Sequence, residues 1–289
     1  MAKKIMFENE IEPTISNDNK IQIEKLKNPY FVVNGISKTF KNGAGVKDIT
    51  FSITKGEIVG FIGDNGAGKT TTIKLIFGEH KKDAGSVSLE GIPSTDKTTL
   101  NRIAFFPDQN NFPKKFNIVE YAYYCASLKG LSRKEVGKYI DMYLEGLDLL
   151  KFKKNKFDEL SARMQKRALL LSTLVTDPEI IVLDEPTANL DVKSRLEFME
   201  ILDYLSKEHG KTIMITSHNI DELNNLVNRA ILVKKINNRG QVIYDKYFDK
   251  NTENLRDVYI NAIGKNDSGI NFEKIKKITE LKEAEREVK

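Results

Sequence analysis

The sequence predicts an α/β fold in which a mostly parallel sheet is connected by helices. Three observations support this prediction. Short apolar runs bounded by Gly, Asn, Asp or Pro dominate residues 30–106, and their length and flanks are typical of strands. Strand and helix patterns alternate over residues 179–235, which indicates crossovers onto a parallel sheet. A glycine-rich loop joins the strand pattern "EIVGFIG" directly to a helical pattern.

Length and composition fit one large or two modest domains. The chain has 289 residues, 40% of them hydrophobic, and its 46 Lys and Arg against 41 Asp and Glu give a formal net charge of +5. This charge weakly favours anionic partners and identifies none. Cys125 is the single cysteine, so we expect neither an intrachain disulfide nor a zinc cluster. We also expect no membrane-spanning segment and no secretory signal, because no run of about 18 apolar residues occurs.

Three regions are predicted along the chain. Residues 1–28 are polar, charged and without periodicity, which indicates an N-terminal extension. Residues 29–249 carry the strand and helix patterns, with an inserted helical stretch at about 115–160. Residues 250–289 are expected to form a C-terminal helical tail. Apolar residues of this tail recur along one helical face at Phe272, Ile275, Ile278 and Leu281.

The stretch "GDNGAGKTT" has the spacing of a phosphate-binding loop. Gly63 is followed, after four residues, by Gly68, Lys69 and Thr70, between a strand and a helix. Glycines let backbone amides turn toward phosphate oxygens, and the helix N-terminus adds its dipole. Lys69 can reach the terminal phosphates, and the Thr70 hydroxyl can bind Mg²⁺. The predicted binding residues are consecutive in the chain: Gly63, Asp64, Asn65, Gly66, Ala67, Gly68, Lys69, Thr70 and Thr71.

A pair of carboxylates follows a second buried strand. Asp184 and Glu185 come directly after "IIVL", at the carboxyl end of a predicted parallel strand, where open α/β sheets bind ligands. Asp184 can hold Mg²⁺, directly or through water. Glu185 can accept a proton from an attacking water molecule. The phosphate loop favours these roles over a simple acidic turn.

A third stretch, "LSARMQKR", predicts a helix that begins after an N-cap at Ser161. Arg163, Lys166 and Arg167 lie in its first turns. Positive side chains at the positive end of a helix dipole are unfavourable by about 0.3 to 1 kcal/mol each when exposed. The pattern therefore predicts that an anion lies close to this helix start.

Together these stretches resemble the nucleotide-binding domain of ATP-binding cassette (ABC) proteins. The motifs "GDNGAGKTT", "FFPDQ", "LSARMQKR", "IIVLDEPTANLD" and "ITSH" occur in that family's order and approximate spacing, between about Tyr30 and Tyr244. The resemblance implies a P-loop NTPase (RecA-like) core with an antiparallel β subdomain and an inserted α-helical subdomain. It also implies ATP and Mg²⁺ as cofactors and ATP hydrolysis as the activity.

The resemblance implies further site residues. Phe40 matches the aromatic residue that stacks on adenine, with Val46 packed nearby, and an ordinary core phenylalanine is the alternative. His218 matches the histidine that contacts the γ-phosphate. The stretch "NLD", which ends at Asp191, matches the loop that crosses the interface between two cassettes.

The glutamine loop departs from the family pattern. Pro107 is followed by Asp108 and only then by Gln109, whereas the family places Gln directly after Pro. Acidic residues replace this Gln in some exporter-type relatives. Either Asp108 or Gln109 is therefore expected to approach the Mg²⁺ and the attacking water, and the two rank equally.

The resemblance also implies partners. In this family two cassettes pack head to tail, so Ser161 and Arg163 would face the γ-phosphate that a second ABC domain binds. The helical stretch and the glutamine loop would form a groove for a helix of an integral membrane permease. The chain would then lie at the cytoplasmic face of the cell membrane. Its signature resembles Ser-x-Gly-Met, the common variant among exporter-type subunits.

Two other functions stay open. Arg163, at a position where the family has Gly, and the displaced glutamine favour a catalytically weak regulatory ABC subunit in a heterodimer. The complete phosphate loop, Asp184, Glu185 and His218 favour hydrolysis instead. A soluble ABC protein that acts on nucleic acid or ribosomes is disfavoured, because the sequence shows one cassette and no long heptad arms. No nucleic-acid partner is expected.

Overall fold

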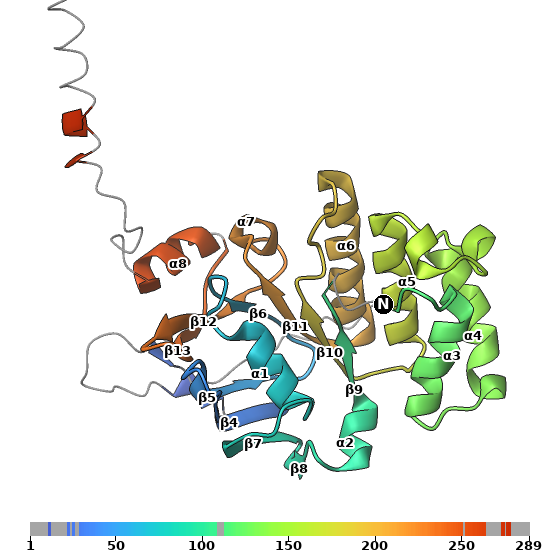
Figure 1. Cartoon of the computed structure of the whole chain (residues 1–289), viewed down its shortest axis with the longest axis horizontal. Coiled ribbons are helices and arrows are strands. Elements are labelled where there is room, and N and C mark those ends of the chain that lie inside the picture. Colours follow the sequence, from blue (N-terminus) through green and yellow to red (C-terminus); the bar gives the residue numbers. More distant parts are fainter. Residues whose placement is uncertain are drawn as a thin grey trace, which may run out of the picture.

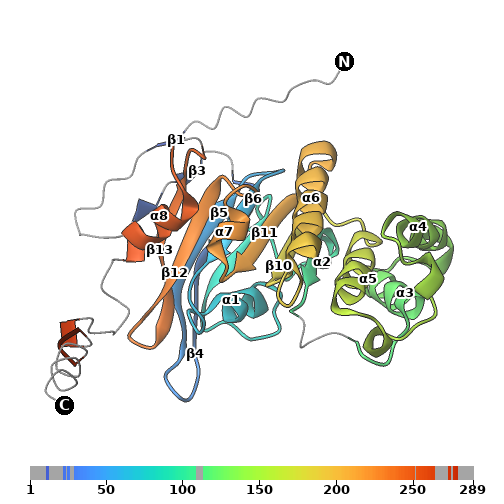
Figure 2. The same ribbon diagram turned by 90° about the horizontal axis from the view of Figure 1, so that it is seen from above.

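The computed structural model has a mixed β-sheet at its centre, with helices packed around it (Figures 1 and 2). It describes residues 11–12, 22–23, 25–26, 29–108, 113–250, 252–263, 273–274 and 276–278. Most of the predicted C-terminal amphipathic stretch, Phe272, Ile275 and Leu281 included, therefore lies outside the described residues.

The central sheet contains every strand that the apolar runs predict. Its strand order is β8-β7-β4-β5-β13-β12-β6-β11-β10-β9. In chain order the strands are β4 (Phe31–Thr39), β5 (Gly45–Ile53), β6 (Ile58–Ile62), β7 (Ala84–Leu89), β8 (Ile92–Pro93), β9 (Ile103–Phe106), β10 (Ile180–Asp184), β11 (Thr212–Ser217), β12 (Arg229–Ile236) and β13 (Arg239–Tyr247).

The sheet has a parallel part and an antiparallel part. Strands β9, β10, β11, β6 and β12 are parallel neighbours. Strands β4, β5, β7 and β8 pair antiparallel, and β13 joins the two parts by pairing antiparallel with β12 and parallel with β5. The expected parallel core and antiparallel β subdomain are thus confirmed as parts of one continuous sheet.

The N-terminal extension contains short strands that the sequence did not predict. β2 (Gln22–Ile23) pairs parallel with β13, and β1 (Ile11–Glu12) pairs antiparallel with β3 (Lys25–Leu26). Strands of two residues are too short to produce an alternating pattern, so periodicity does not reveal them.

The helices lie on both sides of the sheet and at one end of it. They are α1 (Lys69–Ile76), α2 (Lys97–Arg102), α3 (Ile118–Leu128), α4 (Arg133–Gly146), α5 (Ala162–Leu174), α6 (Val192–His209), α7 (Ile220–Leu223) and α8 (Leu255–Ile263). Helices α3, α4 and α5 gather beyond α6 in both views, and they include the predicted helical stretch (Figures 1 and 2). Helix α8 packs against α7 and β12.

The core fills both faces of the parallel strands. In β6, Ile58 and Ile62 belong to the hydrophobic cluster on the side of α5 and α6, whereas Val59 and Phe61 belong to the cluster shared with α1 and the antiparallel strands. This alternation follows from the strand geometry, in which successive side chains point to opposite faces. The sheet is therefore covered on both faces, and its polar groups concentrate at strand ends.

None of the helices in the described part of the chain is both long enough and apolar enough to cross a membrane.

Candidate functional site

The phosphate loop connects the end of β6 to the start of α1. Gly66 and Gly68 have positive φ angles of 78° and 99°, which favour glycine. Gly63 lies so close to β12 that an added Cβ atom would stand 2.3 Å from the Val233 carbonyl oxygen. An added Cβ atom at Gly68 would stand 2.7 Å from Cγ1 of Val46. The glycines are thus required by backbone conformation and by close packing.

Lys69 lies inside this loop with its ammonium group held by main-chain oxygens. Its Nζ donates to the carbonyl oxygens of Gly63 at 2.6 Å and Asp64 at 3.3 Å. The carboxylate of Glu185 is 3.7 Å away, and only 6% of the Lys69 side chain is exposed. The lysine therefore places a positive charge where the loop glycines present their amides.

Thr70 and Asp184 meet across the site. The Thr70 hydroxyl donates to Oδ2 of Asp184 at 2.8 Å, and the Thr216 hydroxyl donates to Oδ1 at 2.7 Å. Asp184 ends β10 and Thr216 belongs to the neighbouring parallel strand β11, so the sheet fixes both positions. The described residues contain no cluster of three or more His, Cys, Asp or Glu side chains that could bind a metal by itself. A metal here would need oxygen ligands from a bound molecule or from water.

Glu185 and His218 form a second pair beside Lys69. Nδ1 of His218 contacts Oε2 of Glu185. Glu185 has a φ of 49°, and its backbone amide donates to the Thr216 hydroxyl at 3.0 Å. A positive φ is uncommon for glutamate and persists only where the surroundings impose it. This backbone conformation is part of the turn after β10.

A cavity of about 240 Å³ opens over the phosphate loop, and Lys69, Thr70 and Glu185 line it. Phe40 lines it and contacts His80 edge-on, with ring centroids 5.5 Å apart. Phe40 is only partly buried and does not belong to the hydrophobic core, which argues against an ordinary core phenylalanine. Val46, in contrast, is fully buried beneath Gly68. The other lining residues are Ala44, Gly45, Asn65, Gly66, Gly68, Thr71, Lys235 and Asn238.

Lys235 and Asn238 also line this cavity, and neither is predicted from the sequence. They come from the β12–β13 hairpin, where Asn237 and Asn238 both have positive φ. The amide of Asn238 donates to the Asn42 carbonyl oxygen at 3.5 Å, which joins the hairpin to the loop after Phe40. The "NN" pair could have indicated a tight hairpin, but its position beside a phosphate loop depends on tertiary structure.

Comparisons with known proteins agree with this geometry. The family described as ABC transporter matches residues 46–188. The SkfA peptide export ATP-binding protein SkfE of Bacillus subtilis is 30% identical over 74% of this chain and 88% of the relative. An uncharacterized ABC transporter ATP-binding protein of Methanocaldococcus jannaschii is 30% identical over 72% of this chain and 75% of the relative. The chain belongs to the family of ABC transporter ATP-binding proteins.

Other comparisons define the extent of the likeness. An ABC transporter ATP-binding protein of Mycoplasma pneumoniae is 32% identical over 69% of this chain, and the match spans 60% of that relative's length. A dimeric ATP-binding cassette, solved in a post-hydrolysis state bound to ADP and Pi, has a TM-score of 0.67 and 26% identity. It covers 76% of this chain, and the match covers 99% of that chain. The fold is therefore that of ABC cassettes, which are P-loop ATPases.

The stretch that resembles the family's signature forms the start of α5, and this helix begins at the predicted N-cap. The Ser161 hydroxyl accepts a hydrogen bond from the Met164 backbone amide at 3.4 Å. The cavity over the phosphate loop is lined by none of Ser161, Arg163 and Asp191. Asp191 instead caps α6, where its carboxylate accepts a hydrogen bond from the Ser194 backbone amide at 2.9 Å. This hydrogen bond is the main reason why the pKa of Asp191 is lowered. The signature and the phosphate loop are thus separate surfaces of one cassette.

An anion does lie at the start of this helix, and it belongs to the same chain. Oε2 of Glu197, on α6, accepts from Arg163 at 2.7 Å and from Arg167 at 3.0 Å. Glu197 was not predicted from the sequence, because it lies 34 residues from Arg163 and no local pattern connects them. The phosphate of a partner cassette, which the family resemblance implies at this helix start, stays a prediction. Lys166 differs from both arginines. Only 2% of its side chain is exposed, and its Nζ lies over the Phe106 ring.

The glutamine loop of the cassette is described only up to Asp108, and Gln109 lies outside the described residues. Burial lowers the pKa of Lys166 to about 8, and the carboxylates of Asp108, Asp184 and Glu185 oppose that shift. Asp108 therefore lies within electrostatic reach of the same buried lysine as the carboxylates that follow β10. The equal ranking of Asp108 and Gln109 stays a prediction.

Proposed function

We propose that the chain is the ATP-binding and ATP-hydrolysing subunit of an ABC transporter that powers transport through separate membrane subunits. The observation that carries this proposal is the cluster in which Lys69, Thr70, Asp184, Glu185 and His218 meet at the phosphate loop. This cluster combines a cation, oxygen ligands for a metal and a carboxylate base. Phosphoryl transfer to water requires these three kinds of group.

Thr70 and Asp184 are the proposed Mg²⁺ ligands. Their oxygens lie 2.8 Å apart, and hydroxyl and carboxylate oxygens suit this hard cation. Mg²⁺ commonly takes its remaining ligands from substrate phosphates and water, which agrees with a site that has few protein carboxylates. When bound, the ion neutralises charge on the terminal phosphates. Gln109 is a further candidate ligand on the basis of family resemblance alone.

The chain's own residues have separate tasks in this proposal. Lys69 transfers its hydrogen bonds from the loop carbonyls to the β- and γ-phosphate oxygens. Glu185 accepts a proton from the attacking water, with Asp108 or Gln109 helping to orient that water. His218 contacts the γ-phosphate and holds the Glu185 carboxylate in place. Phe40 stacks on the adenine at the open end of the cavity.

A second ABC domain, identical or related, completes the site. The separation of Ser161 and Asp191 from the phosphate-loop cavity supports this step, as does the dimeric form of the solved cassette bound to ADP and Pi. The free backbone amides at the start of α5 and the Ser161 hydroxyl would face the γ-phosphate held by the partner cassette. ATP then stabilises the closed dimer, and hydrolysis removes that stabilisation.

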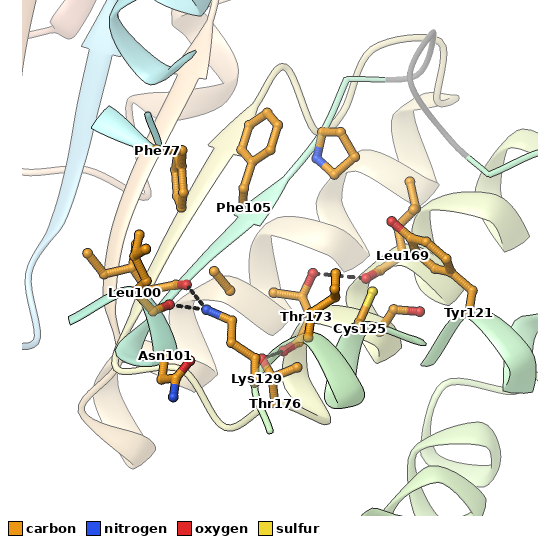
Figure 3. A pocket seen from close by; sticks show the side chains of 15 residues that line it. Phe77, Leu100, Asn101, Phe105, Tyr121, Cys125, Lys129, Leu169, Thr173 and Thr176 are labelled. Atoms are coloured by element: carbon orange, nitrogen blue, oxygen red, sulfur yellow. Dashed lines mark hydrogen bonds between the residues drawn. The ribbon is translucent and has the colours of Figure 1, made fainter. Parts of the chain in front are cut away.

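An integral membrane permease is the proposed partner at a cavity of about 270 Å³ between the sheet and the helical layer. Figure 3 shows Phe77 and Phe105 on the side of the sheet and Tyr121 and Cys125 on α3. Leu128 is 66% exposed at the rim. Such a concave apolar surface is suited to a helix of another protein. The chain would thereby be held at the cytoplasmic face of the membrane. The SkfE relative, named for peptide export, supports an exporter-type complex.

One observation favours the alternative of a regulatory subunit with a weak site. Arg163 stands where family members have Gly, and its side chain is paired with Glu197. This side chain adds bulk to the start of α5, the surface that would approach the nucleotide of the partner cassette. This alternative concerns the partner's site, because the phosphate-loop cluster of this chain has all its expected groups.

The decisive experiment compares Glu185→Gln with Glu208→Gln, a matched change at an exposed position of α6. We expect Glu185→Gln to lower the ATPase rate of the assembled complex by at least about a hundredfold, because the general base is lost. ATP binding should persist, and Glu208→Gln should keep the wild-type rate. An unchanged rate in Glu185→Gln would show that Glu185 is not the base.

The transporter assignment needs a separate measurement. Purification from detergent-solubilised membranes should bring an integral membrane protein with the chain, identifiable by mass spectrometry. Leu128→Glu, which places a charge at an exposed residue that lines this cavity, should reduce that recovery without changing ATP affinity. Recovery of ribosomal or DNA-bound proteins instead would support a soluble, non-transport ABC ATPase.

A further inference from the structure

Helix α8 follows the last strand of the sheet and returns to the phosphate loop. Leu255 and Val258 are buried, and the Leu255 amide donates to Oδ1 of Asn224 at 2.8 Å. At the other end of the helix, Nζ of Lys234 on β12 donates to the Ile263 carbonyl oxygen at 3.2 Å. The helix is therefore fixed against α7 and β12 at both of its ends (Figures 1 and 2).

One side chain of α8 contacts the phosphate loop directly. The Tyr259 hydroxyl donates to Oδ1 of Asp64 at 2.6 Å. Burial, followed by the hydrogen bond to Asp64, raises the pKa of Tyr259 above its ordinary value. The phenol thus keeps its proton at neutral pH and serves as a donor.

The backbone of Asp64 is part of the network that holds the loop lysine. The Asp64 carbonyl oxygen accepts from Nζ of Lys69 at 3.3 Å and from the Ala67 amide at 3.1 Å. The adjacent Gly63 is packed against Val233 of β12, the strand on which α8 is docked. A change in the orientation of Asp64 would therefore reach the lysine that binds phosphate.

We propose that Tyr259 is a positioning residue for the phosphate loop, and that it couples the docking of α8 to nucleotide binding. The carboxylate of Asp64 would repel the phosphates if it turned toward them, because like charges at short range disfavour binding. The hydroxyl of Tyr259 holds that carboxylate on the side of α8. The proposal rests on ATP binding at this loop.

Linkage gives the coupling a second, reciprocal consequence. If the docked form of α8 binds ATP more tightly, then ATP must stabilise the docked form by the same factor. A purely structural hydrogen bond would have no such relation to the nucleotide. Hydrogen exchange in α8 therefore reports on the proposal independently of affinity.

The first test measures ATP affinity by equilibrium titration with a fluorescent ATP analogue. Tyr259→Phe removes only the hydroxyl, and Tyr204→Phe, at an exposed tyrosine of α6, is the matched control. We expect Kd to rise about threefold in Tyr259→Phe, the effect of one solvent-accessible hydrogen bond to a charged group, and to stay unchanged in the control. Equal Kd values in both variants would overturn the proposal.

A double-mutant cycle tests whether the hydroxyl of Tyr259 acts through the Asp64 carboxylate. In an Asp64→Asn background, we expect Tyr259→Phe to have little further effect, because the carboxylate that the hydroxyl restrains is gone. A full threefold loss in that background would mean that the hydroxyl does not act through the Asp64 carboxylate, and would overturn the proposed route. ATP should also slow hydrogen exchange in α8 of the wild type more than in Tyr259→Phe.

The proposal and the ATP-binding function fail in different ways. If the wild-type chain does not bind the analogue, the function proposed for the phosphate loop is wrong. If the wild type binds and Lys69→Ala does not, but Tyr259→Phe binds like the wild type with equal protection of α8, the inference alone is wrong.

Discussion

The phosphate loop and the start of α5 are both helix N-termini with basic side chains close by, but these cations have different partners. At the loop, Lys69 bonds to main-chain carbonyls at 2.6 and 3.3 Å, and the carboxylate of Glu185 is farther away at 3.7 Å. Phosphate oxygens can therefore replace the carbonyls while Glu185 keeps its contact with His218. At α5, Arg163 and Arg167 share the carboxylate of Glu197, which is a charged competitor for any incoming phosphate.

This difference predicts how easily the cation of each region can leave its present partner for a phosphate. Hydrogen bonds from an ammonium group to neutral carbonyls are weaker than bonds to phosphate, so nucleotide binding can release Lys69 at low cost. An arginine pair on a partly buried carboxylate is harder to break, because separation would leave the carboxylate without compensation. The cation of the loop can therefore turn to a phosphate, whereas Arg163 and Arg167 of α5 stay paired with Glu197 of α6 and leave the Ser161 hydroxyl and the backbone amides as the donors at the α5 start.

The largest effect is expected from Lys69→Ala. Loss of the cation at the loop should weaken ATP binding by about a hundredfold, because charge-assisted bonds to phosphate are among the strongest in proteins. Equilibrium titration measures the change. Lys74→Ala, which removes a partly exposed lysine of the same helix that pairs with Glu79, should leave the affinity near the wild-type value. Similar losses in both variants would mean that general charge, and not the loop, binds ATP.

Phe40→Ala should weaken ATP binding by about tenfold, because an aromatic face stacked on adenine is lost. The same variant should unfold at nearly the wild-type denaturant concentration, since Phe40 lies at the cavity and outside the core. Phe61→Ala is the comparison, because its fully buried ring should cost about 3 to 5 kcal/mol of unfolding free energy. Large destabilisation by Phe40→Ala would restore the alternative of a core phenylalanine.

Arg163→Gly should raise the ATPase rate of the assembled complex by about threefold, since it removes bulk from the face that approaches the partner's nucleotide. It should also lower the unfolding free energy by about 1 kcal/mol, because Gly disfavours a helix. An unchanged or lower rate would count against the steric explanation.

Glu197→Gln provides the complementary change at the same contact. It releases Arg163 without shortening it, so the rate should fall or stay constant where Arg163→Gly raises it. A rise in both variants would mean that freeing the arginine, and not removing it, is what assists turnover.

The smallest effect concerns Lys129, beside the cavity in Figure 3, whose ammonium group donates to the Leu100 and Ile103 carbonyls. Burial lowers its pKa to about 8 from the model-peptide value of 10.5. Between these two pH values the unfolded chain binds more protons than the folded chain, so stability should increase as pH rises from about 8 to 10.5.

Lys129→Met removes the titrating group. The difference in unfolding free energy between wild type and Lys129→Met, measured by denaturant titration at several pH values, should therefore shift in favour of the wild type over that window. A constant difference across the window would contradict a lowered pKa for Lys129.

Local patterns predicted the strands and the phosphate loop well, because their residues are adjacent in the chain. "GDNGAGKT" encodes its turn through glycines at positive φ, and "IIVLDE" places its carboxylates at the end of a strand whatever surrounds it. Ser161 at the start of α5 was found in the same way, since its cap spans three residues.

The contacts that were missed join residues far apart in sequence. Glu197 at Arg163, the β12–β13 hairpin at the cavity and Tyr259 at Asp64 leave no periodic or spacing signal. Their partners are separated by 34 residues for Glu197 and by 195 for Tyr259. Helix α8 was expected only as part of a tail, because two buried side chains in nine residues are too few to predict a docking site.

The sequence by itself thus determined the α/β class, the chemistry of the phosphate loop and the carboxylates after β10, because backbone conformation and strand ends are set by neighbouring residues. Only the tertiary structure decided which distant side chain each of these groups contacts. Thr70 meets Asp184, Arg163 meets Glu197 and Asp64 meets Tyr259 because the sheet and the helices packed on it bring distant segments within hydrogen-bond distance.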